Sequence, residues 1–388
     1  MSISRKTEEE VDMMKISLLD LKAQYSTIKQ EIDEALARVV ESQHFILSEE
    51  VSSLESEVAA YTDVFYSAGV ASGTDALILA LHALGVGKGD KVITTPFTFF
   101  ATGEAISSLG AEPVFVDIDS GTYNIDPEKI EEYLKRGKRR EARGKRVKAI
   151  LPVHLYGQCA DMTRIMRIAL KYDLKVVEDC AQAIGAVHNG KKAGNFGNAG
   201  ALSFFPSKNL GGFGDGGMVV SRDEALIARV KRLRIHGSTG QYVHGEIGYN
   251  SRLDSLQAAV LRVKLKMLDS WLAGRGRIAG KYDEAFSSHN IRIPAVLPGN
   301  THTYHQYTVA VDDRDILLKH LNDNGVAARV YYPVPLHLQP CYKGLGYSEG
   351  DFPACEAASS NVLSIPVYPE LTDEAIGYVI DTVRDFYK

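Results

Sequence analysis

Apolar residues recur at helical spacing in the first part of the chain. Between Leu19 and Val40 they are separated by charged residues, and the segment from Ser48 to Tyr61 repeats the pattern. Apolar positions every three or four residues predict amphipathic helices over both segments. Residues 1–14 are polar and acidic instead, so we expect a loose leader there, without the apolar centre of a signal peptide.

Short apolar runs alternate with helical patterns through the middle of the chain. The runs are 65–70, 91–95, 113–117, 149–153 and 174–179, and the helical patterns include 76–84, 101–109 and 163–171. This alternation is typical of an α/β fold with a mostly parallel central sheet flanked by helices. Two further runs, 199–205 and 218–220, enclose a glycine-rich loop and predict a strand, a tight loop and a strand.

The elements change character in the last third of the chain. Helical patterns cover 225–235 and most of 256–286, and from about 292 onward the elements become shorter. We expect a large α/β domain over residues 15–265 and a smaller C-terminal α+β domain over 266–388. The smaller domain has predicted strands at 308–311 and 330–332 and predicted helices at 316–324, 353–361 and 372–386.

Composition narrows the class of protein. A chain of 388 residues suits two domains, and a net charge of -5 gives no reason to expect nucleic acid or an acidic membrane surface as a partner. No apolar run approaches the length of a membrane span. The four cysteines lack metal-ligand spacing, and Cys159 and Cys180 lie in apolar surroundings, so we expect buried thiols, no metal and a reducing cytoplasm.

One lysine, Lys208, lies between an apolar run and the glycine-rich stretch 211–217. Glycines let a backbone approach a ligand closely, and burial lowers the pKa of a lysine toward neutrality, where the amine attacks carbonyl groups to form a Schiff base. The simpler interpretation is a surface lysine in a turn. The other candidate residues decide between the two.

Three features lie where predicted strands end. The turn Ser72-Gly73-Thr74-Asp75 precedes a helix and offers free N–H groups to an anion, although taken alone it favours an ordinary helix cap by Ser72 or Thr74. Asp179 ends a buried strand, which favours a cationic partner, such as a protonated ring nitrogen, and Gln182 follows it. The aromatic group Phe97, Phe99 and Phe100 follows another strand and suits either stacking on a planar ring or core packing.

The chain also carries a basic run, residues 135–148, with a single acid at Glu141. Such runs are usually solvated surface, although attraction of a phosphorylated substrate is an alternative. The other four features, namely a Schiff-base lysine, an acid, an anion-binding turn and an aromatic face, together describe a site for pyridoxal phosphate.

The sequence resembles the DegT/DnrJ/EryC1/StrS sugar aminotransferases, which have the aspartate aminotransferase (type I) fold. The resemblance runs from Leu19 to the C-terminal helix. It rests on six motifs: 71–77 (ASGTDAL), 152–157 (PVHLYG), 178–182 (EDCAQ), 203–208 (SFFPSK), 248–254 (GYNSRLD) with Gln257, and 332–337 (YPVPLH).

This resemblance implies a role for each matching residue. Lys208 binds the aldehyde of pyridoxal 5'-phosphate, Asp179 pairs with the ring nitrogen, and Gln182 contacts the ring hydroxyl. Phe99 lies on the ring face, where the family often has Trp or Tyr. The implied phosphate ligands are Gly73, Thr74, Ser203 and Asn250 of a second subunit, so the resemblance implies a homodimer with shared sites, and the implied substrate ligands are His154, Arg252 and His337.

The implied reaction is transfer of an amino group from L-glutamate to a nucleotide-linked keto-hexose, with pyridoxamine 5'-phosphate formed in between, in amino-sugar or polysaccharide biosynthesis. Relatives that dehydrate sugars have histidine in place of the lysine, so Lys208 favours amino transfer. The form Asn-Ser-Arg-Leu-Asp at 250–254 is similar to members that act at C3 of the sugar. The alternatives are a C4 aminotransferase of the same family, a non-catalytic regulatory protein that binds the cofactor, and an adaptor protein.

Overall fold

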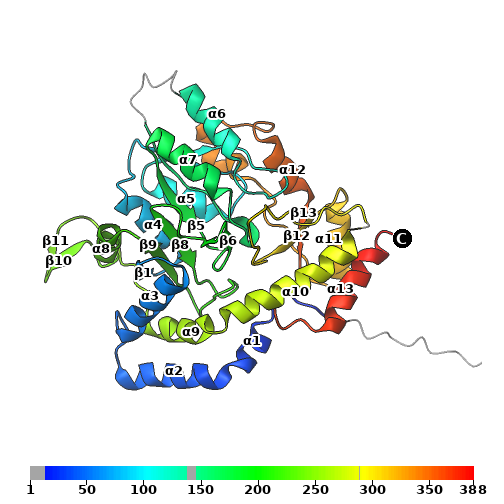
Figure 1. The fold of residues 1–388 in the computed structure, drawn as a ribbon, viewed down its shortest axis with the longest axis horizontal. Helices are drawn as coiled ribbons and strands as arrows, with labels where there is room; N and C mark the ends of the chain where they lie inside the picture. Colours follow the sequence, from blue (N-terminus) through cyan, green and yellow to red (C-terminus); the bar gives the residue numbers. More distant parts are fainter. Residues whose placement is uncertain (1–13, 138–145, 288) are drawn as a thin grey trace, which may run out of the picture.

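The computed structural model describes residues 14–137, 146–287 and 289–388, and its centre is a seven-stranded sheet in the order β1-β9-β8-β5-β4-β2-β3 (Figure 1). The pairings of β9 with β1 and β8 are antiparallel and the others are parallel, which confirms the predicted mostly parallel sheet. The strands are β1 (Tyr66–Val70), β2 (Lys91–Thr94), β3 (Glu112–Phe115), β4 (Val147–Ile150), β5 (Lys175–Asp179), β8 (Ala199–Ser203) and β9 (Gly217–Ser221).

Helices cover both faces of this sheet. Side chains alternate between the faces of a strand, so Val219 of β9 packs among residues of α4 and α8, whereas its neighbours Met218 and Val220 pack among residues of α3 and α9. One face carries α4 (Gly73–Ala83), α5 (Phe100–Ser108) and α8 (Glu224–Leu233), and the other carries α3 (Glu49–Tyr61), α6 (Pro127–Gly137), α7 (Met162–Tyr172) and α9 (Ser255–Leu265).

The helical pattern predicted over 19–40 is confirmed, but it forms two helices with a break at Ile28. α1 (Leu21–Thr27) is capped by Asp20, and α2 (Lys29–Ser42) follows after Ile28, whose backbone leaves the helical region at φ -132° and ψ 19°. Ile28 is buried with Ile32 of α2 and Trp271. Burial of Ile28 in this cluster accompanies the break in a pattern that is continuous in sequence.

The C-terminal part has its own apolar core around the antiparallel pair β12 (Tyr307–Ala310) and β13 (Val362–Ile365). Ile16, which precedes α1, packs in this core, and the predicted boundary at 265 falls between α9 and the long helix α10. The division into two domains stays a prediction. The remaining helices are α10 (Leu268–Phe286), α11 (Arg314–Asp323), α12 (Pro353–Asn361) and α13 (Asp373–Asp385), with 3-10 turns η1 (Leu155–Gly157), η2 (Leu336–Leu338) and η3 (Pro340–Leu345).

The predicted strand at 330–332 is wrong, and β13 was not predicted. Arg329 pairs with Ser364 of β13 only as an isolated bridge, after which Tyr332 turns toward Phe97 and Phe99. The apolar run of β13 directly follows α12, where periodicity alone does not separate a buried strand from more helix.

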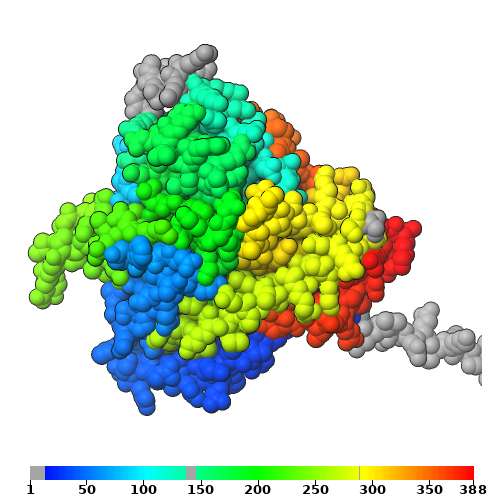
Figure 2. Space-filling model, in the orientation of Figure 1, coloured from blue at the N-terminus to red at the C-terminus, as the bar shows by residue number. Residues whose placement is uncertain are grey.

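Two small hairpins lie outside the main sheet. β6 (Val187–His188) pairs with β7 (Lys191–Lys192), and β10 (Ser238–Gly240) pairs with β11 (Val243–His244). The second hairpin projects from the body beside α8 (Figures 1 and 2), and Tyr242 at its tip is 89% exposed.

Several expectations about single residues can be compared with the structure. Cys159 and Cys180 are buried, as predicted, and all four cysteines are free thiols. The described ends of the basic run form ion pairs, for example Lys135 with Glu131, and residues 138–145 of that run lie outside the described residues. Across the described ranges, no helix is long and apolar enough to cross a membrane.

Candidate active site

The predicted site residues gather where the parallel strands end. β5 and β8 run side by side, with Asp179 opposite Ala201, so Asp179 and Ser203 end neighbouring strands at the same edge of the sheet. Lys208 follows β8 in the predicted loop between β8 and β9. The carboxyl edge of such a sheet is where α/β proteins bind their ligands.

Lys208 is half-buried, and its own N–H donates to the carbonyl oxygen of Phe205 at 2.8 Å, which closes a tight turn. Burial lowers the pKa of its amine to about 8, against an opposing effect of the negative charge of Asp179. The surface-lysine interpretation therefore fails. The amine exchanges its proton close to neutral pH, as a nucleophile or a general base must.

Asp179 is 5% exposed and accepts two hydrogen bonds, from Thr102 Oγ1 at 2.8 Å and from the N–H of Ala181 at 3.2 Å. Burial raises the pKa of its carboxyl group, and these two donors, with the nearby charge of Lys208, oppose the rise. In the described part of the chain Asp179 forms no ion pair. Sequence reasoning missed Thr102, because a threonine inside α5 belongs to no recognisable motif.

The turn before α4 is closed tightly against the end of β8. Ser72 is the helix cap, since its Oγ accepts from the N–H of Asp75 at 3.1 Å. A Cβ atom on Gly73 would lie 2.6 Å from Cβ of Ser203, so only glycine fits beside that serine. Gly73, Thr74 and Ser203 thus surround the N-terminus of α4, where N–H groups and the helix dipole favour an anion.

Aromatic side chains form one wall of the site. Phe99 is 58% exposed and its ring centroid lies 6.1 Å from that of Tyr332, whereas Phe97 is fully buried in the core. Gln182 donates from Nε2 to the Tyr332 hydroxyl at 3.0 Å and accepts from the N–H of Tyr156 at 2.7 Å. Of the three phenylalanines considered, Phe99 is the one with an open ring face.

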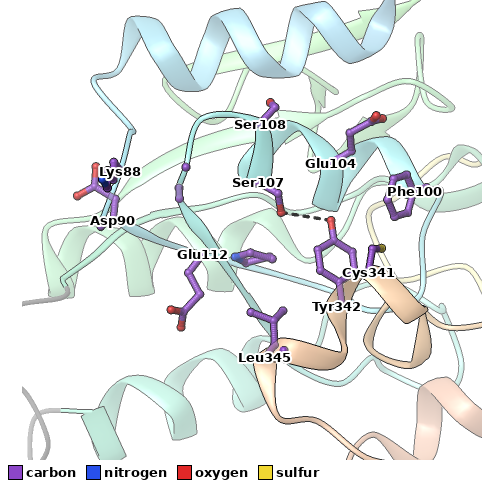
Figure 3. Close-up of a pocket in the computed structure, with 15 residues that line it drawn as sticks. Lys88, Asp90, Phe100, Glu104, Ser107, Ser108, Glu112, Cys341, Tyr342 and Leu345 are labelled. Atoms are coloured by element: carbon purple, nitrogen blue, oxygen red, sulfur yellow. Dashed lines mark hydrogen bonds between the residues drawn. The ribbon is translucent and has the colours of Figure 1, made fainter.

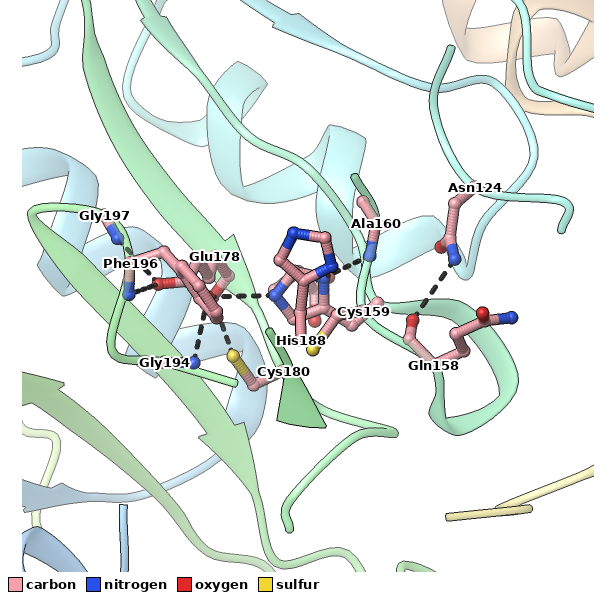
Figure 4. A network of polar contacts seen from close by, with 12 residues as sticks. Asn124, Gln158, Cys159, Ala160, Glu178, Cys180, His188, Gly194, Phe196 and Gly197 are labelled. Atoms are coloured by element: carbon pink, nitrogen blue, oxygen red, sulfur yellow. Dashed lines mark hydrogen bonds and ion pairs between the residues drawn. The ribbon is translucent and has the colours of Figure 1, made fainter. Parts of the chain in front are cut away.

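Glu178, one residue before Asp179, lies in a different environment (Figure 4). It is fully buried, and His154 Nε2 lies 2.9 Å from its Oε2. The other ring nitrogen of His154 accepts from the N–H of Ala160 at 3.1 Å, so Nε2 carries the proton and donates it to Glu178. Three backbone N–H groups also donate to the carboxylate at 2.8–2.9 Å, those of Gly194, Phe196 and Gly197.

This network concerns two predictions from the sequence, namely that His154 binds substrate and that the protein holds no metal. His154 has no exposed surface and both of its ring nitrogens are occupied within the protein, so the structure places it behind the site rather than in contact with a substrate. His154, Glu178 and Cys180 also offer ligand atoms within 4.8 Å of one another, a spacing that suits a metal ion. The carboxylate and imidazole atoms in this group already bond to protein, so the network explains the arrangement without a metal.

The other predicted substrate and phosphate residues differ in their surroundings. His337 is buried, and its Nε2 lies 3.0 Å from Glu356 Oε1. Arg252 is half-buried, with no hydrogen bond or ion pair to any residue that the structure describes. Asn250 is exposed, and the next residue, Ser251, donates to Asp75 at 2.6 Å, which ties this segment to the first turn of α4.

The residues fit pyridoxal phosphate. The cofactor has an aldehyde, a phosphate and a ring nitrogen that is basic enough to be protonated. The structure offers an amine of lowered pKa at Lys208, a helix N-terminus at Gly73, and a buried carboxylate at Asp179 that forms no ion pair among the described residues. The open face of Phe99 completes a surface for a planar ring.

A groove of about 770 Å³ lies elsewhere on the molecule, between the second half of α5, the start of β3 and η3 (Figure 3). Ser107 Oγ and the Tyr342 hydroxyl, 3.4 Å apart, meet in it. Glu112 and Asp90 mark the amino ends of β3 and β2, the edge of the sheet opposite Asp179. The groove is therefore separate from the candidate site.

Comparison with known proteins agrees with the fold and the site. The model of the DegT/DnrJ/EryC1/StrS aminotransferase family matches residues 26–384. A "Pleiotropic regulatory protein" of Geobacillus stearothermophilus is 46% identical over 97% of this chain and 99% of its own. A UDP-N-acetyl-3-dehydro-alpha-D-glucosamine 3-aminotransferase of Acidithiobacillus ferrooxidans is 43% identical over 95% and 97%.

Among solved structures, DesV of Streptomyces venezuelae, in complex with a ketimine intermediate, matches with a TM-score of 0.91 and 41% identity over 96% of this chain and 99% of that one. The fold is thus that of the type I pyridoxal phosphate enzymes. The chain belongs to the DegT/DnrJ/EryC1/StrS aminotransferase family, which confirms the family and the enzyme class predicted from the sequence.

Proposed function

We propose that this protein moves an amino group from L-glutamate to a nucleotide-linked 3-keto hexose, with pyridoxal 5'-phosphate held by Lys208, in amino-sugar or polysaccharide biosynthesis. One observation carries the proposal. A lysine whose pKa is lowered to about 8 and a buried carboxylate that forms no ion pair, in the described part of the chain, lie at the same edge of the sheet.

The residues that bind the cofactor act at its two ends, the ring nitrogen and the phosphate. Asp179 keeps the ring nitrogen protonated, and Thr102 keeps Asp179 oriented. Gly73, Thr74 and Ser203 hold the phosphate at the start of α4. When bound, the cofactor supplies a ring that withdraws electrons from the α-carbon of the amino acid.

Lys208 has two tasks in this scheme. It binds the aldehyde of the resting cofactor, and after the amino donor displaces it, its amine moves a proton at the α-carbon of the donor. An amine of pKa about 8 suits both tasks, because near neutral pH it both releases and regains a proton readily. The same proton movements in reverse place the amine on the keto sugar.

Two observations support C3 as the site of amination. The sequence of residues 250–254 is similar to that of family members acting there, and the relative from Acidithiobacillus ferrooxidans is named for a 3-amino transfer.

Arg252 has no protein partner among the described residues, so its guanidinium is available for a diphosphate or a carboxylate of the substrate. The test is turnover of UDP- and dTDP-linked 3-keto and 4-keto sugars, with the amine located by NMR. A product aminated at C4 would replace our proposal with the C4 alternative.

We also propose that the protein works as a homodimer in which Asn250 reaches the phosphate of the partner's cofactor. Asn250 is exposed beside the first turn of α4. Mixing two inactive variants, Lys208→Ala and Asn250→Ala, tests this. Shared sites predict recovery of about a quarter of wild-type activity, because about half of the dimers that form are mixed and each mixed dimer has one intact site of two. If Asn250 serves its own subunit, mixing restores nothing.

A regulatory protein without catalytic activity is the second candidate, favoured by the name of the relative from Geobacillus stearothermophilus. Glutamate-dependent conversion of a keto-sugar nucleotide distinguishes the two. A binder that only senses the cofactor would load pyridoxal phosphate but would not turn over any of the keto-sugar nucleotides.

A further inference from the structure

The loop that carries Lys208 packs closely against helix α9. A Cβ atom on Gly211 would lie 2.3 Å from the carbonyl oxygen of Pro206, and one on Gly212 would lie 2.8 Å from Gln257 Oε1. Gly212 also donates its N–H to the carbonyl oxygen of Phe204 at 2.8 Å. The backbone of the loop is therefore tightly packed, and side chains of α9 contact it.

Lys264 of α9 binds this loop through its ammonium group. Its Nζ donates to the carbonyl oxygen of Gly211 at 2.8 Å and lies 4.9 Å from the ring centroid of Phe213. The residue is 2% exposed and forms no ion pair with any described residue. Burial lowers the pKa of its amine to about 8, although the charge of Glu370 opposes this. A buried cation on a neutral carbonyl is costly to the fold.

Gln257, two helical turns before Lys264, binds the same loop. Its Oε1 accepts the N–H of Phe213 at 2.7 Å, and its amide lies against Gly214. Residues seven apart lie on one face of a helix, so α9 presents two polar side chains to the backbone three to five residues after Lys208. Asp254, whose Oδ1 accepts the N–H of Gln257 at 2.9 Å, caps the start of α9.

We propose that Lys264, together with Gln257, is a positioning residue that fixes the loop so that the amine of Lys208 is held in the buried site. A methionine would fill the space of Lys264 without the cost of burying a charge. What the lysine adds is a strong hydrogen bond to one carbonyl of the loop. The inference rests on the proposed function, since it assigns these residues to the placement of the catalytic amine.

The test follows the Lys208 amine itself. Protein labelled with ¹³C at the lysine Cε is titrated by NMR without cofactor, and Lys208→Ala gives the assignment. In Lys264→Met we expect the loop to loosen and the pKa of Lys208 to rise from about 8 toward its ordinary value of 10.5, because the amine gains water. Lys264→Gln, which keeps a neutral donor, should leave the pKa of Lys208 near the wild-type value. The matched control is Lys266→Met, which removes an exposed charge just after α9.

Kinetics of the loaded enzyme give the second measurement. We expect kcat of Lys264→Met to fall at least about tenfold, because misplacement of a reacting group by an ångström is costly, while KM for glutamate changes little. If Lys264→Met lowers only the melting temperature and leaves the pKa of Lys208 and kcat unchanged, Lys264 is merely structural and the inference is wrong.

A second pair of variants covers the case in which Lys264→Met does not fold. Gln257→Leu removes the acceptor for the N–H of Phe213 without adding a charge and should shift the pKa of Lys208, whereas Lys266→Met, the control, should not. The NMR titration needs neither cofactor nor substrate. A wild-type protein without transaminase activity would therefore overturn the proposed function, whereas an unmoved pKa in every variant would overturn the positioning role.

Discussion

Two adjacent carboxylates at the end of β5 have opposite surroundings. Glu178 accepts hydrogen bonds from three backbone N–H groups and from His154, and it has no exposed surface. Asp179 points to the other face of the strand, accepts two hydrogen bonds, and lies near the amine of Lys208. The sequence presents them as a pair of acids, and the fold separates them.

The difference shows how one strand supports both structure and chemistry. Glu178 is surrounded by donors supplied by the protein, so its charge is stabilised once the chain has folded. Asp179 has fewer donors, and burial raises the pKa of its carboxyl group, so it is a site that a bound cation would complete. Loss of Glu178 should therefore damage the fold, and loss of Asp179 should damage catalysis.

The largest effect is expected for Lys208→Ala. Without the amine there is neither a covalent attachment for the cofactor nor a proton carrier, so amino transfer should fall by about 10⁴-fold or more. The measurement is formation of 2-oxoglutarate from glutamate in the presence of a keto-sugar nucleotide. Activity close to wild type would remove Lys208 from the mechanism.

Asp179→Asn should cost about a hundredfold in kcat, because it replaces a charge-assisted hydrogen bond to the ring nitrogen by a neutral one. The folded protein should lose no stability when free of cofactor, because the raised pKa of Asp179 means that its charge is unfavourable in the folded state. Thermal unfolding of cofactor-free samples, measured beside kcat, checks both parts. A variant that loses stability and keeps its kcat contradicts the comparison with Glu178.

Glu178→Gln should give the reverse pattern. The new amide directs an N–H₂ group at backbone donors, and the variant loses about 3 kcal/mol in the free energy of unfolding while its folded fraction stays active. Urea unfolding gives the stability. Glu132→Gln, which changes an acid on the surface of α6, is the control and should change stability by less than about 0.5 kcal/mol.

The lowered pKa of Lys208 predicts a pH-dependent stability. The folded value of about 8 lies below the ordinary 10.5, so the unfolded chain binds more protons between these values and the stability cost is complete below pH 8. Cofactor-free Lys208→Met should therefore exceed the wild type by about 1–3 kcal/mol at pH 7. The gain should shrink as the pH rises through this window. Lys264 titrates in the same range, and because both proteins contain it, the difference between their unfolding curves isolates Lys208.

The smallest effect is expected for Thr102→Val, which removes one donor from Asp179 without changing the size of the side chain. The pKa of Asp179 should rise further, and kcat should fall about tenfold. Thr102→Ser keeps the hydroxyl group and should retain most of the activity. Activity retained in Thr102→Val and lost in Thr102→Ser would mean that the methyl group, not the hydrogen bond, matters.

The sheet and the lysine loop were predictable because their signals are local. Apolar runs mark the strands, and the glycines around Lys208 mark a tight turn between β8 and β9. The break at Ile28 and the path of Tyr332 were not predictable, since both depend on packing against residues distant in the sequence. Likewise nothing in the local sequence separates Glu178 from Asp179, because the donors to Glu178 come from a loop fifteen to twenty residues further on.

The most direct test of the account is the visible absorption spectrum of the purified protein with pyridoxal phosphate, before and after addition of L-glutamate. We expect a visible band from the lysine-bound cofactor that bleaches with glutamate and is absent from Lys208→Ala. A protein that shows no band of lysine-bound cofactor once unbound cofactor is removed would contradict the assignment of Lys208 and Asp179. A visible band that glutamate does not change would contradict glutamate as the amino donor.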